Sequence, residues 1–216
     1  MSSNTVSPPP RRRGRPPKGR DESQPDTRTL LIRTGVAALT EKGYSAVGLD
    51  EVLRLAQVPK GSFYHCFDSK EAFGQALIEA YAAYFAAKLD RCFDDATRPP
   101  LQRLQRFMAE AQAGMARHDF RRGCLVGNLG QEMGALPESF RRQLGEVFQD
   151  WQARTAACLA AAQQAGEVSS RWDSAWLAEF FWIGWEGAVL RAKLERSAQP
   201  LQAFAEGFFA LLRSTP

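Results

Sequence analysis

Six cationic side chains crowd into "RRRGRPPKGR" (residues 11–20), and no apolar residue separates them. Like charges repel and there is nothing to bury, so this stretch is not expected to fold alone. Guanidinium and ammonium groups at this density bind polyanions such as the phosphates of a nucleic acid. Glycine permits close approach and proline keeps the backbone extended. The stretch therefore predicts a basic arm.

A second candidate is "PKGSFYHCF" (59–67), where Phe63 and Phe67 lie four residues apart and share one helix face. That face is expected to point into a core. The other side leaves small or polar residues exposed: Lys60, Gly61, Ser62, Tyr64 and His65. A short helix of this kind can enter the major groove, with Lys70 in the next helix placed for a phosphate. Solvated lysines and a packed histidine are the alternative interpretation.

The third candidate is Cys124, which follows two arginines in "RRGCLVGNLGQEM" (121–133) at an expected helix start. Both features favour a thiolate, so Cys124 is a candidate sensor of electrophiles. A small core residue at a helix start is the alternative. The four cysteines form no CxxC pair and the only histidines are His65 and His118. Neither a metal site, a cofactor nor a catalytic triad is expected.

Charge is distributed unevenly along the 216 residues. Residues 1–28 hold seven basic and three acidic side chains, whereas the rest hold 21 of each, so the net charge of +4 comes from the arm. Any nucleic-acid site on the body must come from local placement. The most apolar stretch (176–190) is short and contains two glutamates, so it predicts a buried helix rather than a membrane span. The amino-terminal residues lack an apolar signal core.

The chemistry-bearing residues must be positioned by helices, because periodicity indicates an all-α chain of about nine helices. Residues 1–26 are expected to be disordered. Helices are expected at about 26–42, 49–56, 60–66, 68 to beyond 84, 101–118, 123–133, 138–165, 173–196 and 200–213. Gly43 and Gly166 end two of them, and Asp68 or Ser69 caps the fourth.

Two short helices joined by a turn, under a longer first helix, outline a helix-turn-helix. The stretch 43–77 resembles the DNA-binding domain of the tetracycline-repressor (TetR) family, through Gly43-Tyr44, "VPKGSFYHCF" and "DSKEAF". Val47 and Gly48 stand where that family usually has Thr or Ser. The resemblance implies a helix-turn-helix domain (27–75), followed by a ligand-binding and dimerisation domain (76–216). It also implies a homodimeric regulator, most often a repressor, that a small molecule releases from its operator.

The arm contains "RGRPPKGR", which resembles an AT-hook with Arg13 and Arg15 around Gly14. A narrow A·T-rich minor groove concentrates negative potential and attracts arginine. The alternative is a tail that only raises non-specific affinity.

Ligand contacts are expected from polar or aromatic residues set among apolar ones in the second domain. These are Cys124, Asn128, Glu132, Trp182, Trp185 and Glu186. Residues 121–133 also resemble a TetR subgroup that responds to reactive or unsaturated molecules, including acrylate-responsive repressors. Most other aromatic residues are expected in the core or between the last two helices of two protomers.

The sequence thus predicts a cytoplasmic, ligand-responsive repressor that binds a palindromic DNA operator as a dimer. Two rival hypotheses remain. One is a constitutive DNA-binding or architectural protein without effector, and the other is a small all-α enzyme that uses Cys124 as nucleophile. The second lacks a plausible base.

Overall fold

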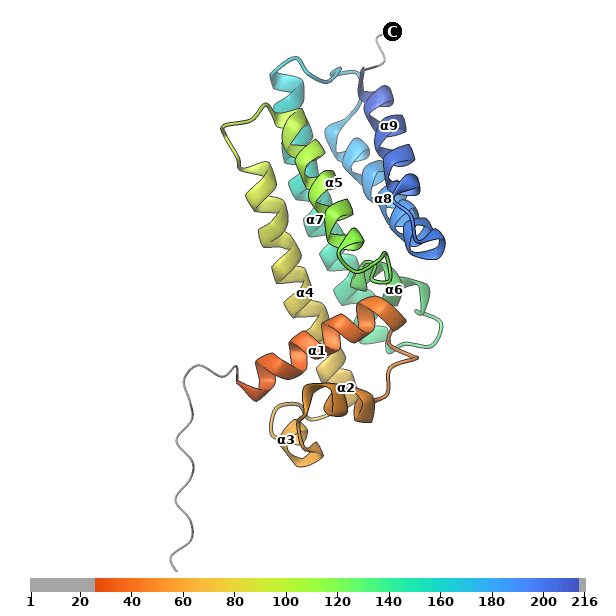
Figure 1. Cartoon of the computed structure of the whole chain (residues 1–216). Coiled ribbons are helices and arrows are strands. Elements are labelled where there is room, and N and C mark those ends of the chain that lie inside the picture. The colour runs from red at the N-terminus through yellow and green to blue at the C-terminus, as the bar shows by residue number, and fades with distance from the viewer. Residues whose placement is uncertain (1–25, 214–216) are drawn as a thin grey trace, which may run out of the picture.

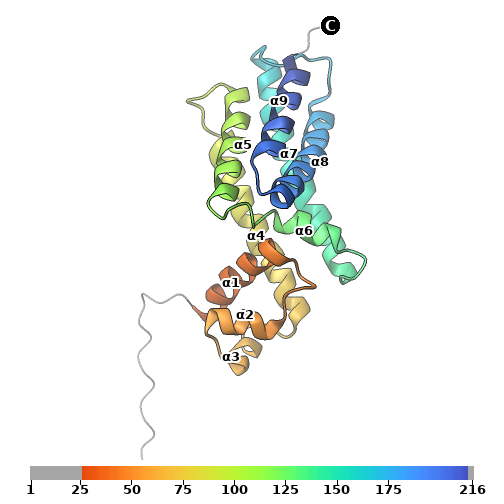
Figure 2. The ribbon, with the colours of Figure 1, turned by 45° about the vertical axis from the view of Figure 1, so that its right-hand side comes forward.

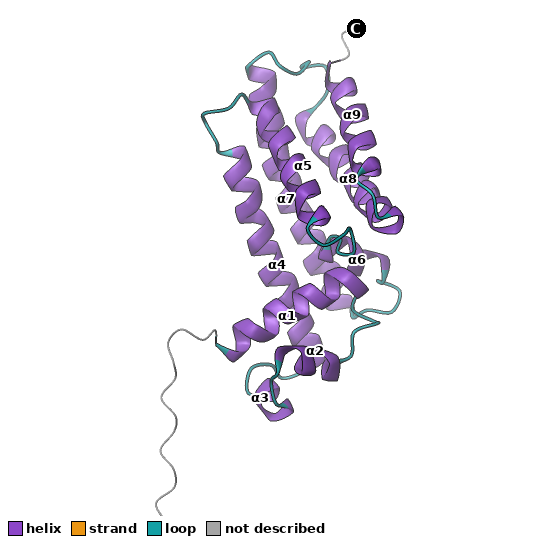
Figure 3. Ribbon diagram, in the orientation of Figure 1, coloured by secondary structure: helices purple, strands orange, loops and turns teal. Residues whose placement is uncertain are grey.

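A computed structural model describes residues 26–213, and this part of the chain contains helices and loops but no strand (Figures 1 and 3). The helices are α1 (Thr27–Lys42), α2 (Leu49–Ala56), α3 (Lys60–Tyr64), α4 (Lys70–Phe93), α5 (Pro100–Ala116), α6 (Leu125–Gln131), α7 (Glu138–Gln164), α8 (Ser174–Glu195) and α9 (Gln199–Arg213). The predicted all-α class is confirmed. The expected disorder of the arm concerns residues outside the described part, apart from Asp26.

Helices α1, α2 and α3 form a small unit at one end of the molecule (Figure 2). Phe63 is 0% exposed and packs against the rings of Phe67 and Phe73, each with ring centroids 5.4 Å away. Phe67 is also buried, so the prediction that both phenylalanines face the core is confirmed. Val47 of the α1–α2 loop and Val52 of α2 add to this core. The aromatic pairs fix α3 against α4.

The helix ends follow the expected chemistry. Gly43 ends α1 with a φ of 85°, a conformation that suits glycine, and its amide donates to the carbonyl of Leu39. Gly48 is the N-cap of α2 and offers no side-chain oxygen. Ser69 caps α4, because its hydroxyl accepts from the amide of Ala72 at 3.0 Å.

Helix α4 joins the two parts of the chain. It runs through the expected domain boundary at residues 75–76 as one continuous helix of 24 residues. It packs on α1, α5 and α7, and the start of α7 already meets its first turns, where Gln143 Nε2 donates to the carbonyl of Gln75. The unit formed by α1, α2 and α3 and the bundle of longer helices are therefore connected by a helix rather than by a loop (Figure 1).

The upper bundle contains α4, α5, α7, α8 and α9, filled by aromatic side chains. The ring centroids of Trp151 and Trp182 lie 4.9 Å apart, and Phe107 packs against Trp182 at 5.9 Å. Trp182 Nε1 donates to the Thr155 hydroxyl, which donates to the carbonyl of Trp151. This buried polar pair satisfies both groups and sets the register of α7 against α8.

One face of α8 is apolar yet open to solvent in the single chain. The exposed residues recur at intervals of three or four with Gly187 between them: Trp176, Phe180, Ile183, Leu190 and Leu194. A stripe with this spacing is the geometry with which one helix packs against another. None of the helices in residues 26–213 is long and apolar enough to cross a membrane.

Candidate functional site

The exposed side of α3 carries the residues predicted to contact DNA. Tyr64 is 53% exposed, whereas the adjacent Phe63 is fully buried. Lys60, Gly61 and His65 are also exposed, and Ser62 is half-buried. The Lys60 ammonium lies 3.3 Å from Asp50, an exposed pair that a phosphate or base could replace at little cost. Helix α3 thus presents a polar surface on an aromatic anchor.

Lys70 has a structural partner as well. Its Nζ donates to the carbonyl of Tyr44 at 3.4 Å and lies 4.4 Å from the centre of the Tyr44 ring. The Tyr44 hydroxyl in turn donates to the carbonyl of Lys70. Burial raises the pKa of this hydroxyl, with a smaller contribution from Glu71. Lys70 therefore ties the α1–α2 turn to α4, and its contact with phosphate stays a prediction.

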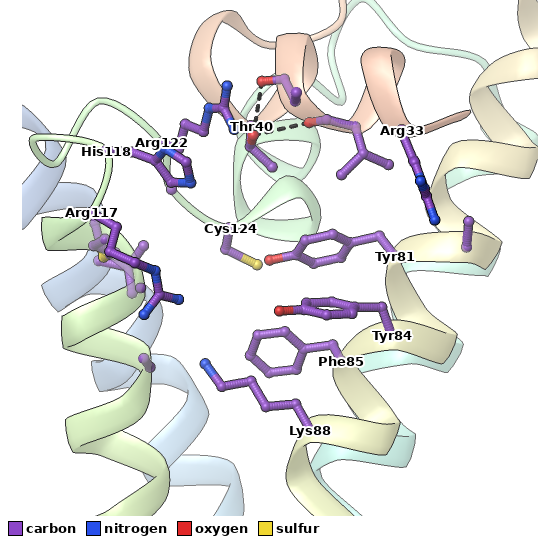
Figure 4. A pocket seen from close by; sticks show the side chains of 18 of the residues that line it. Arg33, Thr40, Tyr81, Tyr84, Phe85, Lys88, Arg117, His118, Arg122 and Cys124 are labelled. Carbon is purple, nitrogen blue, oxygen red and sulfur yellow. Dashed lines mark hydrogen bonds between the residues drawn. The ribbon is translucent and has the colours of Figure 1, made fainter. Parts of the chain in front are cut away.

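A cavity of about 450 Å³ lies between α1, α4, α5, α8 and residues 117–124 (Figure 4). Helix α1 forms part of the cavity wall through Ile32, Val36 and Thr40. The unit of α1, α2 and α3 is therefore in direct contact with the cavity. Tyr81, Tyr84, Phe85 and Lys88 recur at helical spacing along α4 and line the opposite side. A volume of this size suits a small organic molecule.

Basic side chains dominate the polar part of the lining: Arg33, Lys88, Arg117, His118 and Arg122. Figure 4 shows the Lys88 ammonium and the Arg117 guanidinium directed toward the same region. Burial lowers the pKa of Lys88. No ion pair or hydrogen bond of Lys88 occurs within the described residues, and its nearest aromatic contacts are with Phe85 and Phe107 at 5.8 and 5.7 Å. The charge of Glu110 partly offsets this lowering of the pKa, but Glu110 forms no ion pair with Lys88 among the described residues, so the partly buried ammonium favours an anionic ligand.

Cys124 forms the inner wall together with Tyr81 and Glu186. The Tyr81 hydroxyl points toward the Cys124 sulfur (Figure 4), and Glu186 of α8 lines the same part of the wall. Desolvation, and then the charge of Glu186, raises the pKa of Cys124 well above its usual value. Desolvation raises the pKa of Glu186 to about 7.

The expected stabilisation of a Cys124 thiolate by Arg121 and Arg122 is therefore corrected. Arg121 is exposed, and Arg122 is directed to Glu41, with 3.9 Å between Nε and Oε2. The sulfur instead accepts from the amide of Gly127 at 3.4 Å, as the N-cap of α6. Cys124 is a neutral thiol in this conformation, because burial outweighs the helix end.

Three of the six predicted ligand contacts line the cavity, and three do not. Cys124, Trp185 and Glu186 are part of its wall. Trp182 is 1% exposed and belongs to the aromatic core, where Thr155 takes its only donor. Its prediction as a ligand contact is corrected, since its indole is covered by Trp151 and Phe181.

Asn128 and Glu132 have a different role from the one predicted. The Asn128 amide nitrogen donates to the carbonyls of Leu39 and Thr40, each at 3.0 Å. The Glu132 carboxylate accepts from the amides of Tyr44 at 3.0 Å and Ser45 at 2.7 Å. Neither residue lines the large cavity, because both side chains turn toward the end of α1.

The cavity residues that were not predicted from the sequence are mainly basic residues and tyrosines. For some of them, the spacing along one helix could have indicated the site. In "AYAAYFAAK" (80–88), Tyr81, Tyr84 and Lys88 share one face of α4 with Phe85. Polar tips on an otherwise apolar helix face could have indicated a ligand wall. Arg33 and Arg117 carried no local signal, since only the fold brings them to the wall of the same cavity.

Two family profiles match the chain: "Bacterial regulatory proteins, tetR family" over residues 31–77 and "Tetracyclin repressor-like, C-terminal domain" over residues 100–208. The transcriptional regulator AcuR of Cereibacter sphaeroides is 57% identical over 90% of each chain. The transcriptional repressor DhaR of a Mycobacterium species is 34% identical, over 87% of this chain and 93% of its own. The repressor NemR of Escherichia coli is 30% identical, over 82% and 89%.

Comparison with solved structures indicates the same family. A crystal structure of a regulatory protein TetR from Rhodobacter sphaeroides, 58% identical, superposes with a TM-score of 0.85 and covers 86% of this chain and 98% of its own. The reduced form of Escherichia coli NemR, 29% identical, superposes with a TM-score of 0.81 over 89% of this chain and 99% of its own. Both parts of the fold are shared.

Proposed function

The chain belongs to the TetR family of bacterial regulatory proteins, and on that premise we propose which of its surfaces contact the operator and the effector. Like these relatives, it is a ligand-responsive transcriptional repressor and not an enzyme. Regulators of this family bind DNA, typically as dimers with small-molecule effectors. We expect this one to act in the cytoplasm, where its DNA is.

The operator would be read by α3. The observation that supports this is the contrast between its buried phenylalanines and its exposed Lys60, Tyr64 and His65. Two copies of α3 must stand about 34–36 Å apart to enter successive major grooves. The apolar stripe on α8 offers a surface for the pairing of two protomers, which a palindromic operator requires.

The effector would bind in the cavity between α1, α4 and α8. We propose a small unsaturated carboxylate, such as acrylate, whose anionic group contacts Lys88 and Arg117. Tyr81, Phe85 and Trp185 supply an apolar surface for its carbon chain. The alternative of a DNA-binding protein without effector does not account for a half-buried ammonium facing a cavity next to α1.

Acrylate is expected to release the protein from a duplex that covers the region upstream of its own gene, measured by mobility shift. The Lys88→Met variant, which keeps an unbranched side chain without the charge, should need about 10- to 150-fold more acrylate, since a hydrogen bond to a charged group contributes about 1.5–3 kcal/mol. The exposed Arg142→Met is the control with the same charge change. A Lys88→Met variant that responds like the wild type would refute the assignment.

The same mobility-shift assay tells whether Cys124 is a packing residue or a reactive sensor of electrophiles. The Cys124→Ser variant should still release DNA, because the neutral thiol makes packing and hydrogen-bonding contacts that a hydroxyl can replace. Loss of release only in this variant would instead favour an electrophile sensor.

The arm would contact the minor groove beside each operator half-site. Its chain enters α1 at Thr27, and Arg28 lies over the ring of Phe67 at the end of the α3 segment. The start of the described chain therefore lies beside the α3 segment, which supports a role of the arm in DNA contact. Arg13 and Arg15 are therefore proposed as minor-groove contacts.

Deletion of residues 1–25 is expected to weaken binding to operators with A·T-rich flanks more than to those with G·C-rich flanks. The physical reason is the deeper negative potential of a narrow A·T minor groove. Fluorescence anisotropy at fixed salt measures both affinities. Equal weakening on the two duplexes would leave only a non-specific tail.

A further inference from the structure

Four residues from outside the DNA-binding unit make hydrogen bonds to the carboxyl end of α1 and to the turn that follows it. Gly123 donates its amide to the carbonyl of Thr40 at 3.0 Å, and Asn128 donates to the carbonyls of Leu39 and Thr40. Lys193 of α8 reaches the Thr40 carbonyl at 3.4 Å. Glu132 accepts from the two amides that follow Gly43. We name Gly123, Asn128, Glu132 and Lys193 the α1 clamp.

The α1 clamp supplies hydrogen-bond partners for backbone carbonyls that have none within the last turn of the helix. The last carbonyls of a helix have no partner within it, and burial without one is costly. Here a side-chain amide, a backbone amide and an ammonium supply those partners from α6, its preceding loop and α8. A carboxylate that accepts two backbone N–H groups makes charge-assisted bonds, which are stronger than neutral ones. The clamp therefore fixes the α1–α2 turn against the bundle.

Gly43 shows how closely the clamp approaches this turn. A Cβ atom at this position would overlap the Glu132 carboxylate, quite apart from the positive φ. The turn and the carboxylate thus fit only with glycine here. Since α2 begins six residues later, at Leu49, any shift of Glu132 reaches the helix-turn-helix through a short connection.

The same clamp touches the cavity. Arg122, Gly123 and Cys124 line it, and Gly123 is at once a cavity residue and a clamp residue. Thr40 lines the cavity as well, with its hydroxyl donating to the carbonyls of Val36 and Ala37 (Figure 4). A molecule that displaces residues 122–124 must therefore move the end of α1 or break these bonds.

We propose that Glu132 and Asn128 are positioning residues that couple the cavity to the operator-binding surface, without contacting either ligand. The inference rests on the proposed cavity as the effector site. Coupling between two sites is a free energy that acts in both directions, typically equivalent to a 5- to 150-fold change in affinity. A variant without the clamp should bind each ligand but lose most of this factor.

The test compares Glu132→Gln with the control Glu146→Gln, a glutamate exposed on α7. Acrylate binding is followed by the tryptophan fluorescence of the protein, to which Trp185 of the cavity wall contributes, and operator binding by anisotropy with and without saturating acrylate. Glu132→Gln should bind acrylate within about twofold of wild type, while the ratio of operator dissociation constants falls below about threefold. Glu146→Gln should keep the wild-type ratio. A merely structural residue would change thermal stability and both affinities but leave the ratio intact.

A Glu132→Gln protein with the wild-type ratio would overturn the proposal. Asn128→Leu, which keeps the side-chain size, serves as the second variant if the first does not fold. If acrylate does not release the wild-type protein from DNA, the choice of effector is wrong. The α1 clamp is then tested by two measurements that need no effector. Hydrogen exchange at the amides of Tyr44 and Ser45 should then be faster in Glu132→Gln and its operator affinity lower. Unchanged exchange and affinity would refute the clamp.

Discussion

Replacing Phe63 with alanine is expected to lower the free energy of unfolding by about 3–5 kcal/mol. The side chain is fully buried, and its ring contacts those of Phe67, Phe73 and Tyr64 at centroid distances of 5.3 to 5.4 Å. Helix α3 has only five residues, so it cannot be stable without this anchor. Urea unfolding followed by circular dichroism measures the loss.

Operator binding should disappear in the same variant, because the polar face of α3 loses its support. Phe63→Leu keeps most of the apolar volume and should lose far less stability, about 1.5 kcal/mol or less. A Phe63→Ala protein as stable as the wild type would mean that α3 is held by other contacts.

The double variant Lys60→Ala/Tyr64→Ala is expected to lose sequence-specific binding while the fold stays intact. Both side chains are exposed, so their removal should change stability by about 0.5 kcal/mol or less. Each good contact with a base contributes about 1–3 kcal/mol of discrimination, so the operator should lose most of its advantage over a scrambled duplex. Anisotropy titrations on both duplexes measure that ratio.

Binding to scrambled DNA should fall much less, because phosphate contacts from the rest of the surface remain. Arg142→Ala, which removes an exposed cation on α7, is the control and should keep the operator preference. An unchanged preference in the double variant would exclude α3 as the reading helix.

The helices could be predicted from sequence because their signals are local. The glycine after Lys42, the serine before Lys70 and the prolines near residues 59, 99 and 137 mark helix ends whatever the tertiary structure. The burial of Phe63 and Phe67 followed from their spacing of four within one short segment. Polar residues left on the opposite side then had to be exposed.

The cavity could not be predicted, since four helices far apart in the chain form its wall. Arg33 and Arg117 have no local relation, and only the fold brings them to one space (Figure 4). Glu132 was predicted to orient a ligand because a carboxylate among apolar residues needs a partner. The partner is a pair of backbone amides 87 and 88 residues earlier, and no side-chain pattern indicates such a partner.

For Cys124, the sequence left two interpretations open, a sensor of electrophiles and a small core residue at a helix start. The rule that a helix start and neighbouring arginines favour a thiolate considers only the local chain. Here Tyr81 of α4 and Glu186 of α8 bury the sulfur, and desolvation controls its pKa. Long-range packing thus decides the chemistry of a residue whose local sequence suggests the opposite.

The central claim is that α3 of each protomer reads the major groove and that a ligand in the cavity ends this contact. Dimethyl sulfate protection of the DNA upstream of the protein's own gene tests it most directly, because the reagent methylates N7 of guanine in that groove. The account predicts two protected patches about one helical turn apart, which acrylate removes for wild type but not at the same concentration for Lys88→Met. Protection that is absent, or that no ligand of the cavity affects, would contradict it.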